Sequence, residues 1–152
     1  MPQATGKLTK RRYVGSQLTI DHQSNFCHVA HLEDFTANET IEAKHKCDIT
    51  ASACGNAVRK HRSYNGRFSD KAILKDVNDL GQNIEFCGVR AHHQNGISER
   101  VMRTIIESAK KNILYSRRMW PEAMSQAFWS FALSHTTCIH NHLHHDSEGN
   151  TN

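Results

Sequence analysis

The sequence lacks paired cysteine spacings and any long apolar run. Its five cysteines are odd in number and never stand at a C-x-x-C spacing, which argues against a disulfide framework and a paired zinc knuckle. No segment approaches the roughly 18 consecutive apolar residues that a membrane span needs, and the polar N-terminus has no apolar core of a secretory signal. We therefore expect a soluble protein of a reducing compartment, in the nucleus or the cytoplasm.

Composition limits the chain to one moderate domain. Hydrophobic residues make up 38% of its 152 positions, which is low for a larger core. Residues 1–12 are polar, end in "KLTKRR" and are expected to form a basic disordered arm. The folded domain is expected over 13–143, followed by a disordered polar tail over 144–152.

The net charge of +4, with 12 histidines, permits a polyanionic partner without requiring one.

The first half of the folded part predicts a hairpin followed by a helix. Two runs of β-forming residues, 17–22 and 26–32, flank the short polar segment "QSN" and predict antiparallel strands. Thr36 and Glu39 then form an S/T-x-x-E capping pattern, which predicts a helix over 37–53 that stops at Gly55.

The second half predicts two strands and three helices. A strand over 57–62 precedes the turn dipeptide Asn65-Gly66, an amphipathic helix ends at Gly81, and "NIEFCGV" forms a further strand. Two more helices follow, one with apolar residues every four positions and one beginning at Pro121; their apolar residues and aromatics are expected in the core: Ile97, Val101, Ile105, Ala109, Ile113, Trp120, Phe128, Trp129 and Phe131. This order predicts an α/β fold with a mixed sheet flanked by helices.

The segment "VRAHHQNGISER" (89–100) places one carboxylate at the head of a basic helix. At 3.6 residues per turn, Glu99, Arg103 and Lys110 share one side, opposite the apolar one. A carboxylate in this place can hold Mg²⁺ while the basic side contacts phosphates. The alternative is a solvated helix face on which Glu99 and Arg103 form an ordinary i,i+4 pair.

This segment resembles the third catalytic block of copia-type retrotransposon integrases, whose catalytic core belongs to the ribonuclease H-like superfamily. Further blocks resemble the same family in the same order, from about Lys10 to Leu143: "LTIDHQSNFCHVAHL", "NETIEAKHKC", "HRSYNGRFSDKAIL" and "MWPEAMSQAFWSFALSHTTCIHNHL". The resemblance implies a ribonuclease H-like mixed β-sheet and DNA integration by polynucleotidyl transfer.

The resemblance also implies a catalytic triad that is incomplete in this chain. Such integrases use two aspartates and one glutamate to hold two Mg²⁺ ions. Glu99 falls on the third position, as catalytic residue and metal ligand. Tyr64 stands at the second, 99 − 64 = 35 residues earlier, and a phenol is a poor Mg²⁺ ligand. The first aspartate lies on the central strand, which the resemblance places before Met1. Asp21 and Asp70 are not favoured as substitutes.

Three hypotheses follow. The first is an integrase catalytic core-like domain, N-terminally truncated and catalytically impaired, with weak or lost Mg²⁺ binding, DNA as its partner and homo-oligomers as in integrases. The second is a DNA-binding module without chemistry, and the third is a partner-binding remnant that uses the exposed sheet edge. Nucleic-acid contacts are expected from the loop and helix residues His92, His93, Asn95, Arg100, Arg103, Lys110, Lys111, Arg117 and Arg118.

Overall fold

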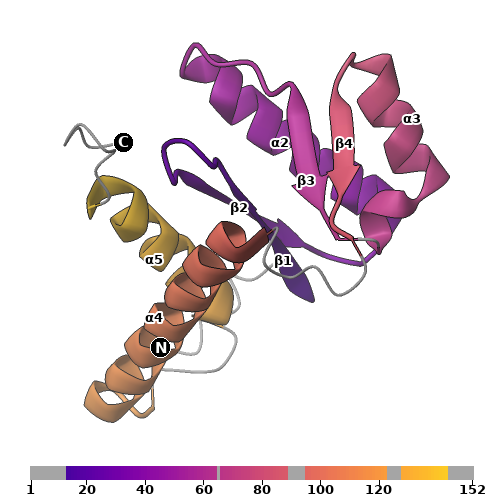
Figure 1. Cartoon of the computed structure of the whole chain (residues 1–152). Helices are drawn as coiled ribbons and strands as arrows, with labels where there is room; N and C mark the ends of the chain where they lie inside the picture. Colours follow the sequence, from indigo (N-terminus) through magenta and orange to yellow (C-terminus); the bar gives the residue numbers. More distant parts are fainter. Residues whose placement is uncertain (1–12, 65, 89–94, 123–127, 144–152) are drawn as a thin grey trace.

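Four strands are interspersed with helices along the described part of the chain, and the last two elements are both helices (Figure 1). The computed structural model describes residues 13–64, 66–88, 95–122 and 128–143, so the expected arm and tail lie outside the described residues. The α/β class is confirmed by the elements in chain order: β1 (Gly15–Ile20), β2 (Cys27–Leu32), α2 (Ala37–Ala53), β3 (Lys60–Ser63), the 3₁₀ helix η1 (Arg67–Ser69), α3 (Lys71–Asp79), β4 (Asn83–Phe86), α4 (Gly96–Met119) and α5 (Trp129–Leu143).

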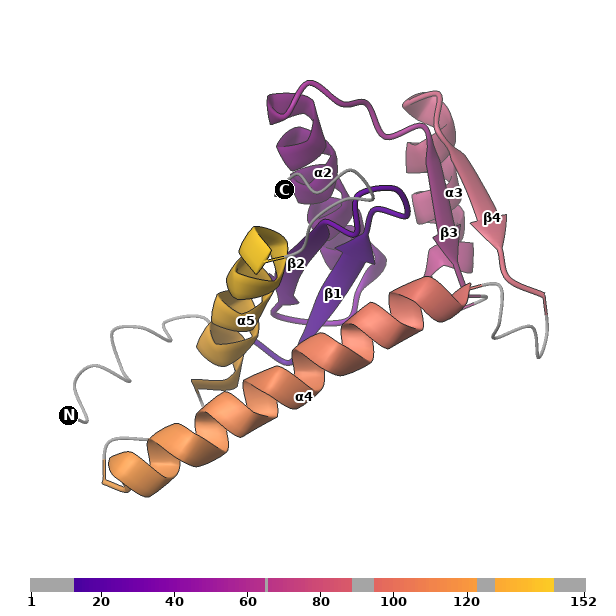
Figure 2. The same cartoon turned by 60° about the vertical axis from the view of Figure 1, so that its left-hand side comes forward.

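The strands form two separate pairs. β1 pairs with β2 in antiparallel register from Gly15 opposite Leu32 to Ile20 opposite Cys27, and β3 pairs with β4 in parallel. Within the described ranges no strand joins β1 to β3, so the expected mixed sheet is divided where the resemblance places a central strand. Figure 2 shows the two pairs apart, with the long helix α4 crossing below them.

Helix α2 has the bounds that its capping pattern predicts. The Thr36 side chain accepts a hydrogen bond from the Glu39 N–H at 3.3 Å, which satisfies one of the free donors of the first turn. The Glu39 carboxylate accepts from the Glu33 N–H rather than from Thr36, so the capping box is only half formed. Gly55 follows the helix end with φ +78°, a left-handed conformation that glycine adopts without steric cost.

The last third differs from the expectation. α4 continues to Met119 although its apolar periodicity ends at Ile113, because its final turns have exposed side chains that periodicity cannot predict. Its buried side begins at Val101 rather than at Ile97, which is 46% exposed. Pro121 lies in a turn, and residues 123–127 lie outside the described residues.

Two of the expected core aromatics are also exposed. Trp120 follows the end of α4 and is 60% exposed, while Phe131 on α5 is 40% exposed. Trp129 does pack against the core, and its ring meets that of His31 edge to face at 5.6 Å.

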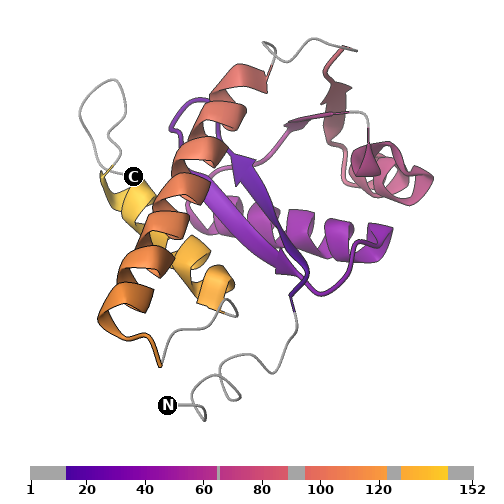
Figure 3. The ribbon, with the colours of Figure 1, turned by 90° about the horizontal axis from the view of Figure 1, so that it is seen from below.

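Helices cover both faces of the β1–β2 pair. Seen from below, the pair lies between α4 and α2 (Figure 3). Asn141 of α5 accepts from the Cys27 N–H and donates to the Cys27 C=O, both at 2.8 Å, and so pairs an open backbone edge of β2. The main core comprises β2, α4 and α5 residues: Cys27, Val101, Ile105, Ala109 and Leu133.

Lys44 of α2 is buried in a polar network that joins α2 to the β3–β4 half of the molecule. The side chain is 1% exposed, and its Nζ lies 3.0 Å from Asp48, 3.1 Å from Asp76 of α3 and 2.8 Å from Gln82 before β4. Burial alone would raise the pKa of Asp76, but the contacts with Lys44 and His45 outweigh it and lower that pKa. These contacts compensate the desolvation of a buried ammonium group.

Replacing Lys44 is therefore expected to destabilise the fold. Lys44→Met leaves the half-buried carboxylates of Asp48 and Asp76 without their cation and should lower the free energy of unfolding by about 3 kcal/mol, measured by urea denaturation. The control, Lys60→Met, removes a lysine that is 53% exposed in its pair with Glu85 and should cost less than about 1 kcal/mol. Equal losses for the two variants would contradict the role of the network.

Candidate metal and nucleic-acid site

Two residues that are 35 positions apart meet where β3 ends and α4 begins. β3 ends at Ser63, which places Tyr64 at the carboxyl end of the strand, and Glu99 lies in the first turn of α4. The Tyr64 hydroxyl donates a hydrogen bond to Oε1 of Glu99, and both side chains are half-buried. The structure therefore brings together the two residues that the resemblance places at the second and third triad positions.

The hydrogen bond fixes the charge state of the pair. The bond to Glu99 raises the pKa of Tyr64 to about 12, and burial and the negative charge of Glu99 act in the same direction. Tyr64 is therefore a neutral donor at neutral pH, and one lone pair of the Glu99 carboxylate is used within the protein.

This arrangement does not fit a two-metal site. A phenol supplies no negative charge to replace the missing carboxylate, and two divalent cations held close together need several carboxylates. In the part of the chain that the structure describes, no group of three or more His, Cys, Asp or Glu side chains is placed to hold a metal ion.

The nearby aspartates have other roles. Asp21 accepts from the backbone N–H and the hydroxyl of Ser24 in the β1–β2 turn, at 2.9 and 2.6 Å. Asp70 is the N-cap of α3 and accepts from the Ala72 N–H at 2.8 Å. Both carboxylates are thus used by local turns and caps, as is common for aspartate in such positions.

The exposed side of α4 is basic along its length. At 100° per residue, the exposed cationic side chains fall within about a third of the helix circumference, opposite the buried Val101 and Ile105. Glu107 is the one exposed acidic residue in this arc. We call the cationic residues the basic stripe: Arg100, Arg103, Lys110, Lys111, Arg117 and Arg118.

The loop residues before α4 are only partly described. His92 and His93, expected to contact nucleic acid, lie outside the described residues. Asn95 is 7% exposed and forms a hydrogen bond with Tyr64, which the sequence pattern did not reveal. Its Oδ1 atom is buried with no hydrogen-bond partner among the described residues. Asn95 therefore lies beside the Tyr64–Glu99 pair and not on the surface.

The chain has the ribonuclease H-like fold of integrase catalytic cores, which confirms the predicted fold class. The catalytic core of HTLV-2 integrase, solved with magnesium in a trimeric form, matches with a TM-score of 0.63 and 17% identity, over 92% of this chain and 96% of that one. The BIV integrase core matches with a TM-score of 0.62 and 17% identity, over 90% and 88%.

A third match is a chain in the structure of the simian T-cell lymphotropic virus intasome in complex with the PP2A regulatory subunit B56γ. Its TM-score is 0.66 at 14% identity, over 90% of this chain, which spans 50% of the length of that one. No protein-family model and no curated protein matches the sequence. At these identities the likeness establishes the fold.

Among the described helices, none combines the length and the apolar composition that a membrane span requires.

The Tyr64–Glu99 hydrogen bond predicts an unusual alkaline titration. Of the three tyrosines, Tyr64 should lose its proton near pH 12, because the carboxylate favours the protonated phenol. Glu99→Gln should lower that pKa, and Tyr64→Phe should remove this titration from the phenolate absorbance curve. If the curve of Glu99→Gln matched that of the unsubstituted chain, the hydrogen bond would not be the cause of the shift.

Proposed function

We propose that this chain is an integrase-core-like domain, of the kind that copia-type retrotransposons encode, that binds DNA without catalysing its integration. The observation that carries the proposal is the hydrogen bond from Tyr64 to Glu99 at the place where the resemblance implies two metal-binding carboxylates. A phenol and one carboxylate that bond to each other have little capacity to hold the cations on which phosphodiester chemistry of this type depends.

The basic stripe supports DNA as the ligand. Six exposed cationic side chains on one side of one helix concentrate positive charge, which attracts phosphates more strongly than scattered surface charge does. All five cysteines are free, which suits a reducing compartment such as the nucleus or the cytoplasm. By analogy with the dimeric and trimeric HTLV-2 cores, we further propose that the domain forms homo-oligomers.

Removing charge from the stripe tests DNA binding. Arg103→Ala/Lys110→Ala should weaken retention of duplex DNA and reduce the slope of log K against log salt by about two, one for each lost phosphate contact. Lys71→Ala/Lys75→Ala removes the same charge from exposed positions on α3 and should leave that slope nearly unchanged. Measurements by fluorescence anisotropy at several salt concentrations give both slopes. Equal effects of the two variants would point to net charge alone.

Nuclease and strand-transfer assays test the loss of catalysis. With Mg²⁺ or Mn²⁺ the purified chain should neither nick DNA nor join strands, and a chelator should leave its affinity for duplex DNA unchanged. Metal-dependent nicking that Glu99→Ala abolishes would contradict the proposal.

A further inference from the structure

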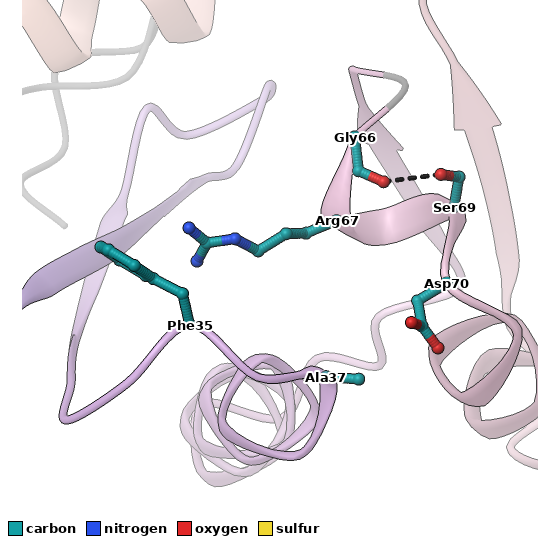
Figure 4. A pocket seen from close by; sticks show the side chains of 6 residues that line it. All are labelled: Phe35, Ala37, Gly66, Arg67, Ser69 and Asp70. Carbon is teal, nitrogen blue, oxygen red and sulfur yellow. Dashed lines mark hydrogen bonds between the residues drawn. The ribbon is translucent and has the colours of Figure 1, made fainter.

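A small pocket opens between the β2–α2 loop and the 3₁₀ helix η1 (Figure 4). Its volume is about 210 Å³, smaller than the roughly 300 to 1,000 Å³ of sites for drug-sized ligands and suited to a single ring system. The lining residues come from two stretches of the chain, 35–37 and 66–70: Phe35, Ala37, Gly66, Arg67, Ser69 and Asp70.

One wall of the pocket is an aromatic ring held in a fixed place. Phe35 is 52% exposed, so about half of its side chain is open to the pocket and to solvent. A Cβ on Gly15 would lie 2.5 Å from Cε1 of Phe35, so the glycine makes room for the ring. On the ring face the Arg67 guanidinium carbon lies 3.9 Å from the centroid, a cation–π contact that orients the guanidinium.

The pocket offers a ligand both hydrogen-bond donors and hydrogen-bond acceptors. Arg67 offers several N–H donors, and none of the ion pairs among the described residues includes it. Asp70 lies on another wall, away from the Arg67 side chain (Figure 4), and one of its oxygens accepts from Ala72, which leaves acceptor sites for a ligand. Gly66 lines the pocket without a side chain. A bound ring therefore meets donors on one side and acceptors on the other.

We propose that this pocket binds an unpaired guanine base of single-stranded nucleic acid. The O6 and N7 atoms of guanine accept from an arginine fork, and its N1–H and N2–H₂ groups donate to a carboxylate. The N1–H and N2–H₂ edge is free to meet a carboxylate only in an unpaired base, because pairing with cytosine uses it. A lone phosphate should bind poorly because the carboxylate of Asp70 repels it. Thymine should bind more weakly than guanine because it has fewer N–H donors for that carboxylate. The pocket is separate from the basic stripe and extends the proposed function.

A pair of oligonucleotides tests the inference. The probes are a short oligothymidylate and the same strand with one central guanine, with affinities measured by fluorescence anisotropy. The guanine strand should bind about tenfold more tightly, the discrimination of one good bidentate contact. This preference should disappear in Arg67→Ala and in Asp70→Asn, where asparagine retains the N-cap of α3. Gly15→Ala, which displaces the Phe35 ring, should reduce it.

Arg59→Ala is the matched control, because it removes an exposed arginine outside the pocket and should keep the tenfold preference. Equal binding of both strands by the unsubstituted chain, or the same loss of preference in Arg59→Ala as in Arg67→Ala, would overturn the inference. Duplex retention tests the basic stripe separately. If the guanine preference is absent while the basic stripe retains duplex DNA, the pocket proposal is wrong. If duplex retention is absent while the guanine preference is present, the proposal for the basic stripe is wrong.

Discussion

The arrangement of this molecule depends on a buried lysine. β1–β2 and β3–β4 share no strand pairing in the described ranges, so side chains must hold the two halves together. Lys44 does this from α2, through ion pairs with Asp48 and Asp76 and a hydrogen bond to Gln82. A buried ammonium group is unfavourable unless fully paired, so the network specifies one position for the β3–β4 half. The positions of Tyr64 and Arg67, which follow β3, therefore depend on it.

A tyrosine at position 64 gives this place a different chemistry from the pair of carboxylates that the family resemblance implies. Where two carboxylates would repel each other and attract a cation, a phenol and a carboxylate attract each other directly. The Tyr64 hydroxyl and the Glu99 carboxylate are hydrogen-bonded to each other without a metal. This bond is the main cause of the raised pKa of Tyr64. The pair also connects the β3–β4 half to α4, so Tyr64 and Glu99 add a structural contact between the two.

The sequence predicted the local elements better than the contacts between them. Helix Ala37–Ala53 and its cap at Thr36 follow from nearby residues, and the meeting of Tyr64 with Glu99 was implied by the family resemblance. The burial of Lys44 was not predictable, because its partners Asp76 and Gln82 lie more than thirty positions away and a lysine in a polar helix is typical of a surface. The contact between Phe35 and Arg67 was missed for the same reason.

The most direct test of the central claim is a crystal structure of the chain grown in Mn²⁺, with anomalous scattering recorded to locate the metal. We expect the Tyr64 hydroxyl within hydrogen-bonding distance of Glu99 and no anomalous peak beside that carboxylate. A manganese ion coordinated by Glu99, with the Tyr64 ring turned away, would contradict the account.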